Sequence, residues 1–486
     1  MNRSFRFPVV FSERRNLLIL LDLIAVNAAL FLFLFPPEFS GIKKFWRSQY
    51  ILSLETIYRH LYWFLLLSIF WLIFAYALNA YDQRVLSRLS QSLLASIKAG
   101  TLTVAVYILI PFISPSLPSS RLSLFSFFVF ALIFLVAGRW LYSIFVGQKI
   151  FNRRALIIGT GWAAKAIYQA IQQEGGGAYE VVGFVAKNPK DKIGQSSGTL
   201  GSKSELNKLF LLKDFNELPA LIHENKIDTL ILAFSEEVNG ETLQTMIDCL
   251  ELGVEAIPMP VLYEQLTGRV PVEYIGNSWY VALPINHPGT KYSWNLAKRL
   301  VDIVLSSVGL TFLALATPFI AAAIYLDSPG PIFYRQSRVG KGGRIFYVYK
   351  FRSMIPNAEK DRPVWAKKND ERVTRVGKIL RKTHIDEFPQ FINILKGEMS
   401  VVGPRPERPE FVEELAREIP FYRLRHAVKP GMAGWGLVRQ GYGASKEDAL
   451  IKLQYDLYYI KHQSPWLDTI ILLKTIFNTI TFRGRA

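Results

Sequence analysis

The hydrophobic positions of this chain gather in long runs. Four runs lie in the first third, and each is close to the roughly 20 apolar residues that a helix needs to cross a bilayer. They are Leu17–Phe35, Leu61–Leu78, Leu93–Ile113 and Leu122–Val146. Lys98 and Arg139 interrupt the last two runs near their ends, where long cationic side chains are expected to reach the membrane surface. The pattern predicts a four-helix transmembrane bundle over residues 1–150.

The middle of the chain alternates short apolar segments with amphipathic ones. Ala155–Gly159 predicts a buried strand that enters a glycine turn, and Trp162–Gln172 has the period of a helix. Val181–Val185 and Thr229–Ala233 predict further buried strands. Such alternation is typical of a parallel sheet covered by helices, so residues 151–288 are expected to form a Rossmann-like α/β domain.

The glycine turn partly matches the dinucleotide fingerprint. Gly159 and Gly161 take the first two glycine places, and Ala164 fills the third. One such match is weak, and the second predicted strand is followed by Ala186 and Lys187 instead of an acidic residue. Two interpretations stay open, a bound nucleotide or a module used for packing or dimerisation. No residue is assigned to an organic cofactor.

A fifth apolar run, Ile303–Leu326, contains Pro318 with Thr317 before it. Proline lacks an amide hydrogen and its ring clashes with the preceding turn, so a helix bends there. The Thr317 hydroxyl can satisfy freed backbone groups. Basic residues flank the run on both sides, and the positive-inside rule places such flanks in the cytoplasm. We expect a re-entrant helix over about 300–326 that breaks at Thr317 and Pro318; a kinked fifth spanning helix is the alternative.

Composition and charge indicate an anionic partner. Half of the 486 residues are hydrophobic, and the formal net charge is +18. Apolar runs beside basic clusters favour membrane lipids and phosphorylated substrates over nucleic acid, because no basic segment matches a DNA- or RNA-binding motif. Cys249 is the only cysteine. This excludes an internal disulfide and fits a reducing compartment, and we expect Cys249 to be an ordinary core residue.

The last third carries an ordered set of short motifs. They are Lys298–Asp302, Ser328–Phe333, Gln336–Gly340, Tyr349–Met354, Asp386–Gln390, Met399–Pro406, Lys429–Gly431 and Lys452–Tyr459. With them, residues 291–486 resemble the bacterial sugar transferases, the monotopic polyprenyl-phosphate sugar-1-phosphate transferases. The whole chain resembles the large members, which place a membrane bundle and a Rossmann-like domain ahead of the catalytic part. The resemblance implies a mainly α catalytic domain over residues 289–486.

The adjacent carboxylates Asp386 and Glu387 are the predicted catalytic pair. The resemblance implies that Asp386 attacks the phosphate next to the sugar and forms a covalent phospho-sugar, with release of UMP. It also assigns contact with Mg²⁺ to both carboxylates. Physically, a divalent cation relieves the repulsion between two neighbouring carboxylates and an incoming diphosphate.

Four cations are candidates for binding substrate phosphate. Phosphoryl transfer needs fixed positive charge around the equatorial oxygens. Arg405 lies between two prolines and has a fork that suits phosphate, while Lys350 and Arg381 match basic positions of the family. The segment from Gly436 to Gly441 departs from the family pattern, and we expect Arg439 to take over the role of the missing arginine. The alternative for each cation is a surface charge near anionic lipid.

These observations predict a membrane protein that combines α and α/β parts and acts as a transferase. The resemblance implies transfer of a sugar-1-phosphate from a UDP-sugar to undecaprenyl phosphate, as the first step of exopolysaccharide, capsule or O-antigen synthesis. We expect a multi-pass protein of the bacterial inner membrane, a homodimer, with its catalytic domain facing the cytoplasm. Two alternatives remain: a membrane-tethered nucleotide-sugar oxidoreductase and a non-enzymatic export scaffold.

Overall fold

The chain divides into two compact units, Met1–Leu262 and Tyr263–Ala486. The computed structural model describes residues 11–34, 59–86, 88–111, 113–115, 121–145, 152–159, 161–186, 209–211, 217–233, 240–274, 283, 292–356, 358, 370–440 and 445–481. The second unit begins ahead of the boundary at residue 288 that the sequence predicted. The division into three domains stays a prediction.

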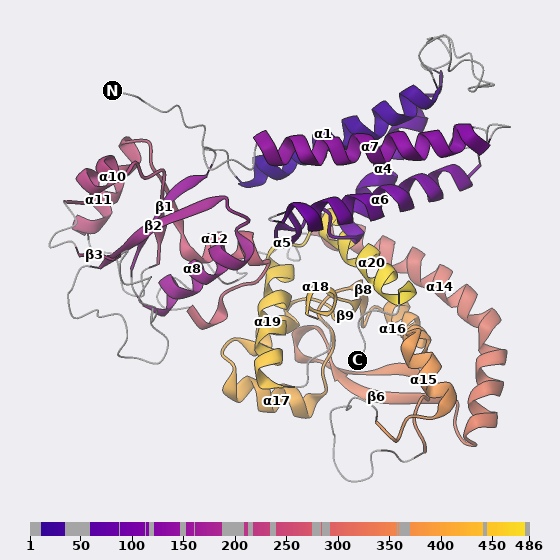
Figure 1. Ribbon diagram of the computed structural model, residues 1–486. Helices are drawn as coiled ribbons and strands as arrows, with labels where there is room; N and C mark the ends of the chain where they lie inside the picture. Colours follow the sequence, from indigo (N-terminus) through magenta and orange to yellow (C-terminus); the bar gives the residue numbers. More distant parts are fainter. Residues whose placement is uncertain are drawn as a thin grey trace. The chain divides into compact units, whose positions relative to one another are not determined.

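Four apolar helices pack against one another in the first unit (Figure 1). They are α1 (Phe11–Leu34), α4 (Leu61–Ala77), α6 (Leu89–Leu109) and α7 (Arg121–Phe145), with the short α5 (Gln83–Leu86) between α4 and α6. Helices α1 and α6 each contact both α4 and α7. Segments of α1, α6 and α7 are long and apolar enough to cross a membrane, whereas α4 is shorter, at 17 residues.

A buried ion pair joins the first and last of these helices. Arg139 of α7 donates from Nη2 to Oδ2 of Asp22 at 2.7 Å, and both side chains are only 1% exposed. Arg139 also donates to the Ala80 carbonyl and to the Ser92 hydroxyl, each at 3.1 Å. The expectation that Arg139 reaches the membrane surface was therefore wrong. A buried guanidinium needs a counter-charge and acceptors, and the facing helices provide both.

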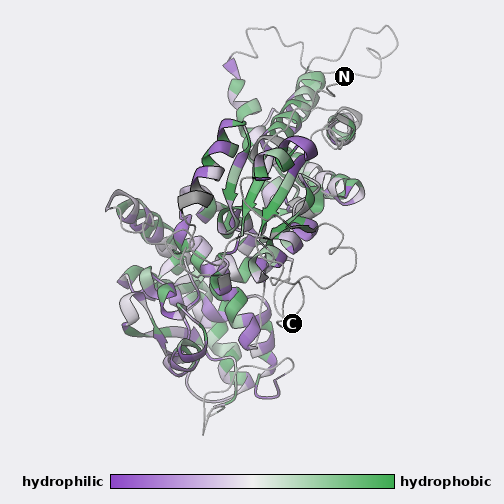
Figure 2. Ribbon diagram, turned by 90° about the vertical axis from the view of Figure 1, so that its left-hand side faces the viewer, coloured by the Kyte–Doolittle hydropathy of each residue, from purple (hydrophilic) through white to green (hydrophobic). Residues whose placement is uncertain are grey.

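The first unit also contains a five-stranded parallel sheet. Its strands are β1 (Arg153–Ile158), β2 (Tyr179–Ala186), β3 (Leu209–Leu211), β4 (Thr229–Leu232) and β5 (Glu255–Pro258), in the order β3-β2-β1-β4-β5. Helices α8 (Trp162–Glu174), α10 (Leu218–Asn225), α11 (Gly240–Glu251) and α12 (Met259–Thr267) accompany it. The strands are apolar along most of their length, as Figure 2 shows. With the apolar helices, the sheet confirms a membrane-associated α/β protein.

Two sequence expectations for this sheet can be checked directly. Gly159 follows β1 with φ 123°, and a Cβ atom there would lie 2.7 Å from the Ala233 carbonyl oxygen, so the close approach to β4 requires glycine. Cys249 of α11 is fully buried beside Leu230 and Val254, and burial raises the pKa of its thiol to about 11. The prediction that Cys249 is a core residue is confirmed.

The second unit starts with a segment that packs on its own C-terminal helices. The end of α12 and the 3-10 helix η3 (Val272–Tyr274) precede the long helix α14 (Tyr292–Asp327). Val270 donates its amide to the Gln454 carbonyl at 3.0 Å, and Trp435 Nε1 donates to the Gly268 carbonyl at 3.1 Å. Val270 and Val272 are buried in the same core cluster as Trp435. Residues 263–274 therefore belong to the C-terminal core.

Helix α14 is 36 residues long and contains Pro318. It is apolar enough to cross a membrane, and its ribbon bends along its length (Figure 1). The Thr317 hydroxyl donates to the Leu313 carbonyl at 2.7 Å. Pro318 has no amide hydrogen, so the carbonyl of Ala314, four residues before it, receives no helix hydrogen bond from it. The predicted proline and hydroxyl therefore lie at one weakened turn of a continuous helix.

The N-terminal half of α14 is fixed to the rest of this unit by polar contacts. Asp302 Oδ1 accepts from the Ser400 hydroxyl at 2.9 Å and from the Val401 amide at 2.8 Å. Arg299 donates to the carbonyls of Ile394 and Leu395. These contacts explain why a polar motif opens an apolar helix: its charged side chains face the rest of this unit and its apolar ones are exposed.

The remaining elements of this unit follow α14 in the chain. The antiparallel hairpin of β6 (Phe333–Val339) and β7 (Ile345–Phe351) turns at η5 (Lys341–Gly343), and β8 (Ser400–Val402) pairs in parallel with β9 (Gly431–Ala433). The helices are α15 (Arg375–Lys382), η6 (Ile385–Gln390), α16 (Phe391–Lys396), α17 (Pro409–Glu418), η7 (Tyr422–Ala427), α18 (Trp435–Arg439), α19 (Lys446–Lys461) and α20 (Pro465–Ile480).

Candidate active site

The predicted carboxylate pair lies at the start of a 3-10 helix, directly after a sharp turn of the chain. Asp386 and Glu387 are in the first turn of η6, and each is only 4% exposed. His384 precedes them in the left-handed region, with φ 59°. The Glu387 amide donates to the His384 carbonyl at 3.1 Å. A non-glycine residue with positive φ is held there by its surroundings, a form of local strain that is common at functional sites.

Two of the predicted phosphate-binding cations meet at Glu387. Lys350 Nζ donates to Glu387 Oε1 at 2.9 Å. Arg405 donates from Nη2 to Oε1 at 2.5 Å and from Nη1 to Oε2 at 3.1 Å. The structure thus brings Glu387, Lys350 and Arg405 together from three separate segments, beside Asp386. A forked contact of this kind fixes the guanidinium plane as well as its position.

Lys350 reaches the carboxylate from the hairpin. It lies on β7 opposite Tyr334 of β6, and its side chain is 17% exposed. Burial lowers the pKa of Lys350, and the negative charge of Glu387 opposes that shift. The ammonium therefore loses its proton more readily than that of an exposed lysine, and the charge of Glu387 limits this effect.

The backbone of Arg405 is held by Arg425, which itself forms a buried ion pair. Arg425 of η7 donates from Nη2 to Asp456 Oδ2 at 2.7 Å, and the two side chains are each 2% exposed. The same nitrogen donates to the Arg405 carbonyl at 2.9 Å, and Arg425 Nη1 donates to the Tyr422 hydroxyl at 2.6 Å. The backbone of Arg405 is thus fixed both by the prolines beside it and by this guanidinium.

A further carboxylate, Glu407, gathers three cations next to this turn. Lys452 pairs with its Oε1, and Arg338 and Arg425 lie at 3.6 and 3.9 Å. Burial acts to raise the pKa of Glu407, but these three positive charges outweigh it and hold the pKa at about 2. Sequence reasoning missed Glu407 and Arg425. Glu407 directly follows the Gly-Pro-Arg-Pro run and was detectable, whereas no spacing pattern marks Arg425.

The other two predicted cations have different neighbours. Arg439 stacks over the Trp435 ring at 4.6 Å from guanidinium carbon to centroid. Arg381 lies in the last turn of α15, and its carbonyl accepts from the His384 amide at 3.3 Å. The roles of Arg381 and Arg439 toward substrate phosphate stay predictions. Gly441, which ends the departing segment, lies outside the described residues.

The donor set suits Mg²⁺ that is shared with a phosphate ligand. No group of three or more potential metal-binding side chains occurs in the described parts of the chain. Mg²⁺ is usually held by one or two carboxylates, with substrate oxygens and waters completing its shell. Asp386 and Glu387 are the adjacent carboxylates at this turn, so the residues present fit such an ion.

Together the fold and the site define a membrane-associated protein with a carboxylate pair and two cations arranged for phosphate chemistry. Residues 293–482 match the bacterial sugar transferase family, and residues 76–254 match a family described as a CoA-binding domain.

Several relatives share large parts of the chain. A UDP-N-acetylgalactosamine-undecaprenyl-phosphate N-acetylgalactosaminephosphotransferase of Aeromonas hydrophila is 42% identical over 51% of this chain and 58% of its own length. A UDP-glucose:undecaprenyl-phosphate glucose-1-phosphate transferase of Xanthomonas campestris is 32% identical over 72% of both chains. An undecaprenyl-phosphate galactose phosphotransferase of Salmonella typhimurium is 30% identical over 67% of this chain and 68% of its own.

This chain belongs to the bacterial sugar transferase family. The family predicted from the sequence is confirmed, and the relatives carry the predicted enzyme class in their names. The match covers less than two thirds of the Aeromonas relative. The sugar donor, the lipid acceptor and the pathway of this protein are therefore part of the proposed function.

Proposed function

We propose that this protein transfers a sugar-1-phosphate from a UDP-sugar to undecaprenyl phosphate, releasing UMP. The observation that carries the proposal is the buried turn at Asp386 and Glu387, where Lys350 and Arg405 converge on one carboxylate. The names of the relatives support undecaprenyl phosphate as the acceptor and, for two of them, a UDP-sugar as the donor. We further propose that this transfer is the first step of exopolysaccharide, capsule or O-antigen synthesis. We also propose that the protein is a homodimer.

The reaction proceeds in two displacements at one phosphorus atom. A carboxylate oxygen of Asp386 attacks the phosphorus next to the sugar, the bond from that phosphorus to the bridging oxygen breaks, and UMP leaves with the bond electrons. An oxygen of the lipid phosphate then attacks the same phosphorus. The bond to Asp386 breaks, which regenerates the carboxylate and gives a lipid diphosphate sugar. The covalent step splits one difficult displacement into two easier ones.

Lys350 and Arg405 provide the positive charge for this chemistry. In the structure they neutralise Glu387. When a diphosphate arrives, its oxygens compete for the same donors, so both side chains are already positioned for the transferred phosphate. Arg425 contributes indirectly, because it holds the Arg405 carbonyl. Mg²⁺ would be held by Asp386 and Glu387 and would supply charge neutralisation for the diphosphate.

The placement of the site at the membrane is part of the proposal. We infer that α14 enters the cytoplasmic leaflet of the inner membrane and returns, so that the catalytic domain faces the cytoplasm. The apolar exposed faces of α14 and the basic residues on both of its flanks support this. Cysteines introduced at Tyr292 and Tyr325 in a Cys249→Ser background should react with a membrane-impermeant thiol reagent from the cytoplasmic side only. Labelling of Tyr325→Cys from the periplasmic side would reject the re-entrant path.

The transfer itself is tested by UMP release from a panel of UDP-sugars with Mg²⁺ and lipid phosphate. Asp386→Asn should abolish release, whereas Glu410→Gln, which changes an exposed carboxylate of α17, should not. Without the lipid acceptor, wild type should still release up to one UMP per active site, because the first displacement needs only the donor. Absence of that burst would contradict the covalent intermediate but leave the overall transfer standing.

The parallel sheet is proposed to be Rossmann-like. Its strand order, β3-β2-β1-β4-β5, corresponds to the 3-2-1-4-5 order of doubly wound nucleotide-binding folds, which supports this interpretation. The oxidoreductase alternative makes this sheet the catalytic part and requires a nicotinamide cofactor. Addition of NAD should leave UMP release unchanged. The scaffold alternative predicts that Asp386→Asn complements a deletion strain as well as wild type does.

A further inference from the structure

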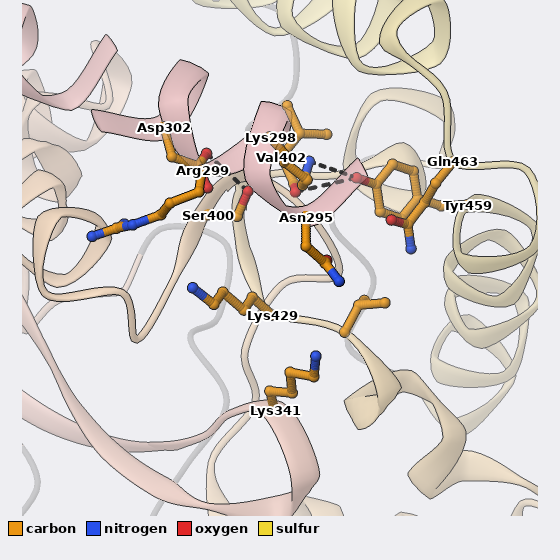
Figure 3. Close-up of a pocket in the computed structure, with 11 residues that line it drawn as sticks. Asn295, Lys298, Arg299, Asp302, Lys341, Ser400, Val402, Lys429, Tyr459 and Gln463 are labelled. Carbon is orange, nitrogen blue, oxygen red and sulfur yellow. Dashed lines mark hydrogen bonds between the residues drawn. The ribbon is translucent and has the colours of Figure 1, made fainter. Parts of the chain in front are cut away.

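The catalytic unit contains a second basic site, a cavity that the proposed reaction does not use. Its volume is about 250 Å³, and Figure 3 shows the side chains that line it. They come from the start of α14, the turn of the β6–β7 hairpin, β8, the segment before β9, and α19 with the segment that follows it. Glu387, Lys350 and Arg405 are not among its lining residues. The cavity is therefore a separate feature of this unit.

Four cations line this cavity, and two of them already have polar partners, although only Lys298 is paired with a carboxylate. Lys298 pairs with Asp468 at 2.5 Å and donates to the Tyr459 hydroxyl at 3.0 Å. Arg299 donates to two backbone carbonyls of α16, which bind its protons but do not neutralise its charge. The one carboxylate in the lining, Asp302, accepts from Ser400 and Val401.

The other two cations, Lys341 and Lys429, form no direct ion pair in the part of the chain that the structure describes. Within the described residues neither ammonium has a hydrogen bond or an ion pair, and in Figure 3 both side chains extend into the cavity. Lys429 Nζ and Arg299 Nη2 lie 3.5 and 3.7 Å from the position of a Cβ atom built on Gly397, so the two charges approach the same point. Burial lowers the pKa of Lys429, as do Arg299 and Lys341, against the opposing charge of Asp302.

We propose that this cavity binds a phosphate group, and that Lys341, Lys429 and Arg299 are its ligands. Three cations around a hollow that contains one carboxylate leave an excess of positive charge, which an anion relieves. A phosphate has several oxygens that accept from such donors, and lysine and arginine are its usual partners.

The size of the cavity favours a phosphate headgroup. Leu296, Leu300 and Val301 lie on the same turns of α14 as Arg299, and all three are exposed. They lie on the face of α14 that points away from the cavity and are not among its lining residues, so the choice of a headgroup rests on the size of the cavity. Its volume is below the roughly 300–1,000 Å³ of pockets that hold drug-sized ligands, so it suits a headgroup better than a whole nucleotide-sugar.

The test is equilibrium binding to the full chain in neutral detergent, with three probes. Farnesyl phosphate tests a lipid phosphate, UMP a soluble phosphate monoester, and inorganic phosphate the free ion. Wild type is compared with Lys341→Gln/Lys429→Gln and with the charge-matched control Lys378→Gln/Lys446→Gln, which removes two exposed lysines of α15 and α19. All are measured in an Arg405→Gln background, so that the Glu387 site contributes little phosphate binding.

We expect the double variant of the cavity to bind farnesyl phosphate on the order of tenfold more weakly than the control, since two charge-assisted contacts are lost. Lys341→Gln alone changes only an exposed turn and should already weaken binding severalfold without disturbing the fold. Loss confined to farnesyl phosphate identifies a lipid source, and equal loss with inorganic phosphate or UMP identifies a soluble one. Equal binding by the cavity variant and the control would overturn the proposal.

Failure of the phosphate-site proposal can be distinguished from failure of the proposed transfer. UMP release in the Arg405 wild-type background depends on Asp386, and it measures the reaction without reference to the cavity. A cavity that binds no phosphate would leave the transferase proposal intact. A protein that transfers no sugar-1-phosphate could still show the phosphate site.

Discussion

Arg405 holds both carboxylate oxygens of Glu387, with Nη2 at 2.5 Å from Oε1 and Nη1 at 3.1 Å from Oε2. The two residues lie 18 positions apart, and neither contact is specified by local structure. Because the guanidinium is planar, this contact also fixes the direction in which its remaining protons point. A lysine at the same position keeps the charge and loses the fork.

Arg405→Lys therefore tests whether geometry or charge matters at this position. We expect UMP release to fall by roughly 10²-fold, because a pre-positioned donor to the transferred phosphate is lost while net charge is kept. The control is Arg408→Lys, in the same segment, where the partner Glu410 is exposed and loose at 3.7 Å. Its rate should stay within about twofold of wild type. Equal rates for the two variants would show that the fork at Arg405 is not used.

The pH dependence of the reaction should report Lys350. Burial lowers its pKa, so the ammonium loses its proton at a lower pH than an ordinary lysine, and UMP release should decline on the alkaline side. Lys350→Arg keeps the charge and should move that decline to higher pH, whatever its effect on the maximum rate. Glu387→Gln removes the charge that opposes the shift and should move the decline to lower pH. Superimposable profiles of wild type and Lys350→Arg would assign the decline to another group.

The backbone at His384 offers a test of strain beside the carboxylate pair. With φ 59°, the position suits glycine and disfavours a β-branched residue by about 1–2 kcal/mol. His384→Gly should keep most of the activity, while His384→Val should lower both UMP release and the unfolding temperature. Both variants lose the imidazole, so they differ only in backbone tolerance and bulk. A similar loss in both would indicate that the imidazole itself takes part in the reaction.

The extent of the catalytic unit can be tested with two truncated chains. One begins at residue 259, with α12, and the other at residue 289, the boundary predicted from the sequence. The shorter chain lacks Val270, Val272 and Leu283, which are buried in the C-terminal core. Three such side chains contribute about 5 kcal/mol, which corresponds to a drop of roughly 10 °C or more in unfolding temperature for a unit of this size. Equal thermal stability would place residues 263–283 outside the folding unit.

The sequence by itself determined the features that depend on local pattern. Long apolar runs predict membrane helices because each residue of such a helix contributes independently to transfer from water. The strands around Ala155, Val181 and Thr229 were predicted from short apolar segments with turn residues between them, and all three are present. The motif around Asp386 and Glu387 identified the family, and the comparisons confirm it.

Only the tertiary structure decided which distant residues meet. Arg139 was expected at the membrane surface and instead pairs with Asp22, 117 residues away. Arg425, which fixes Arg405 and pairs with Asp456, carries no sequence signal, and neither does the convergence of Lys341 and Lys429 on one cavity. The physical reason is that a charge buried away from water must find its partner in space. The path of the intervening chain determines that partner, and no periodicity of the sequence records it.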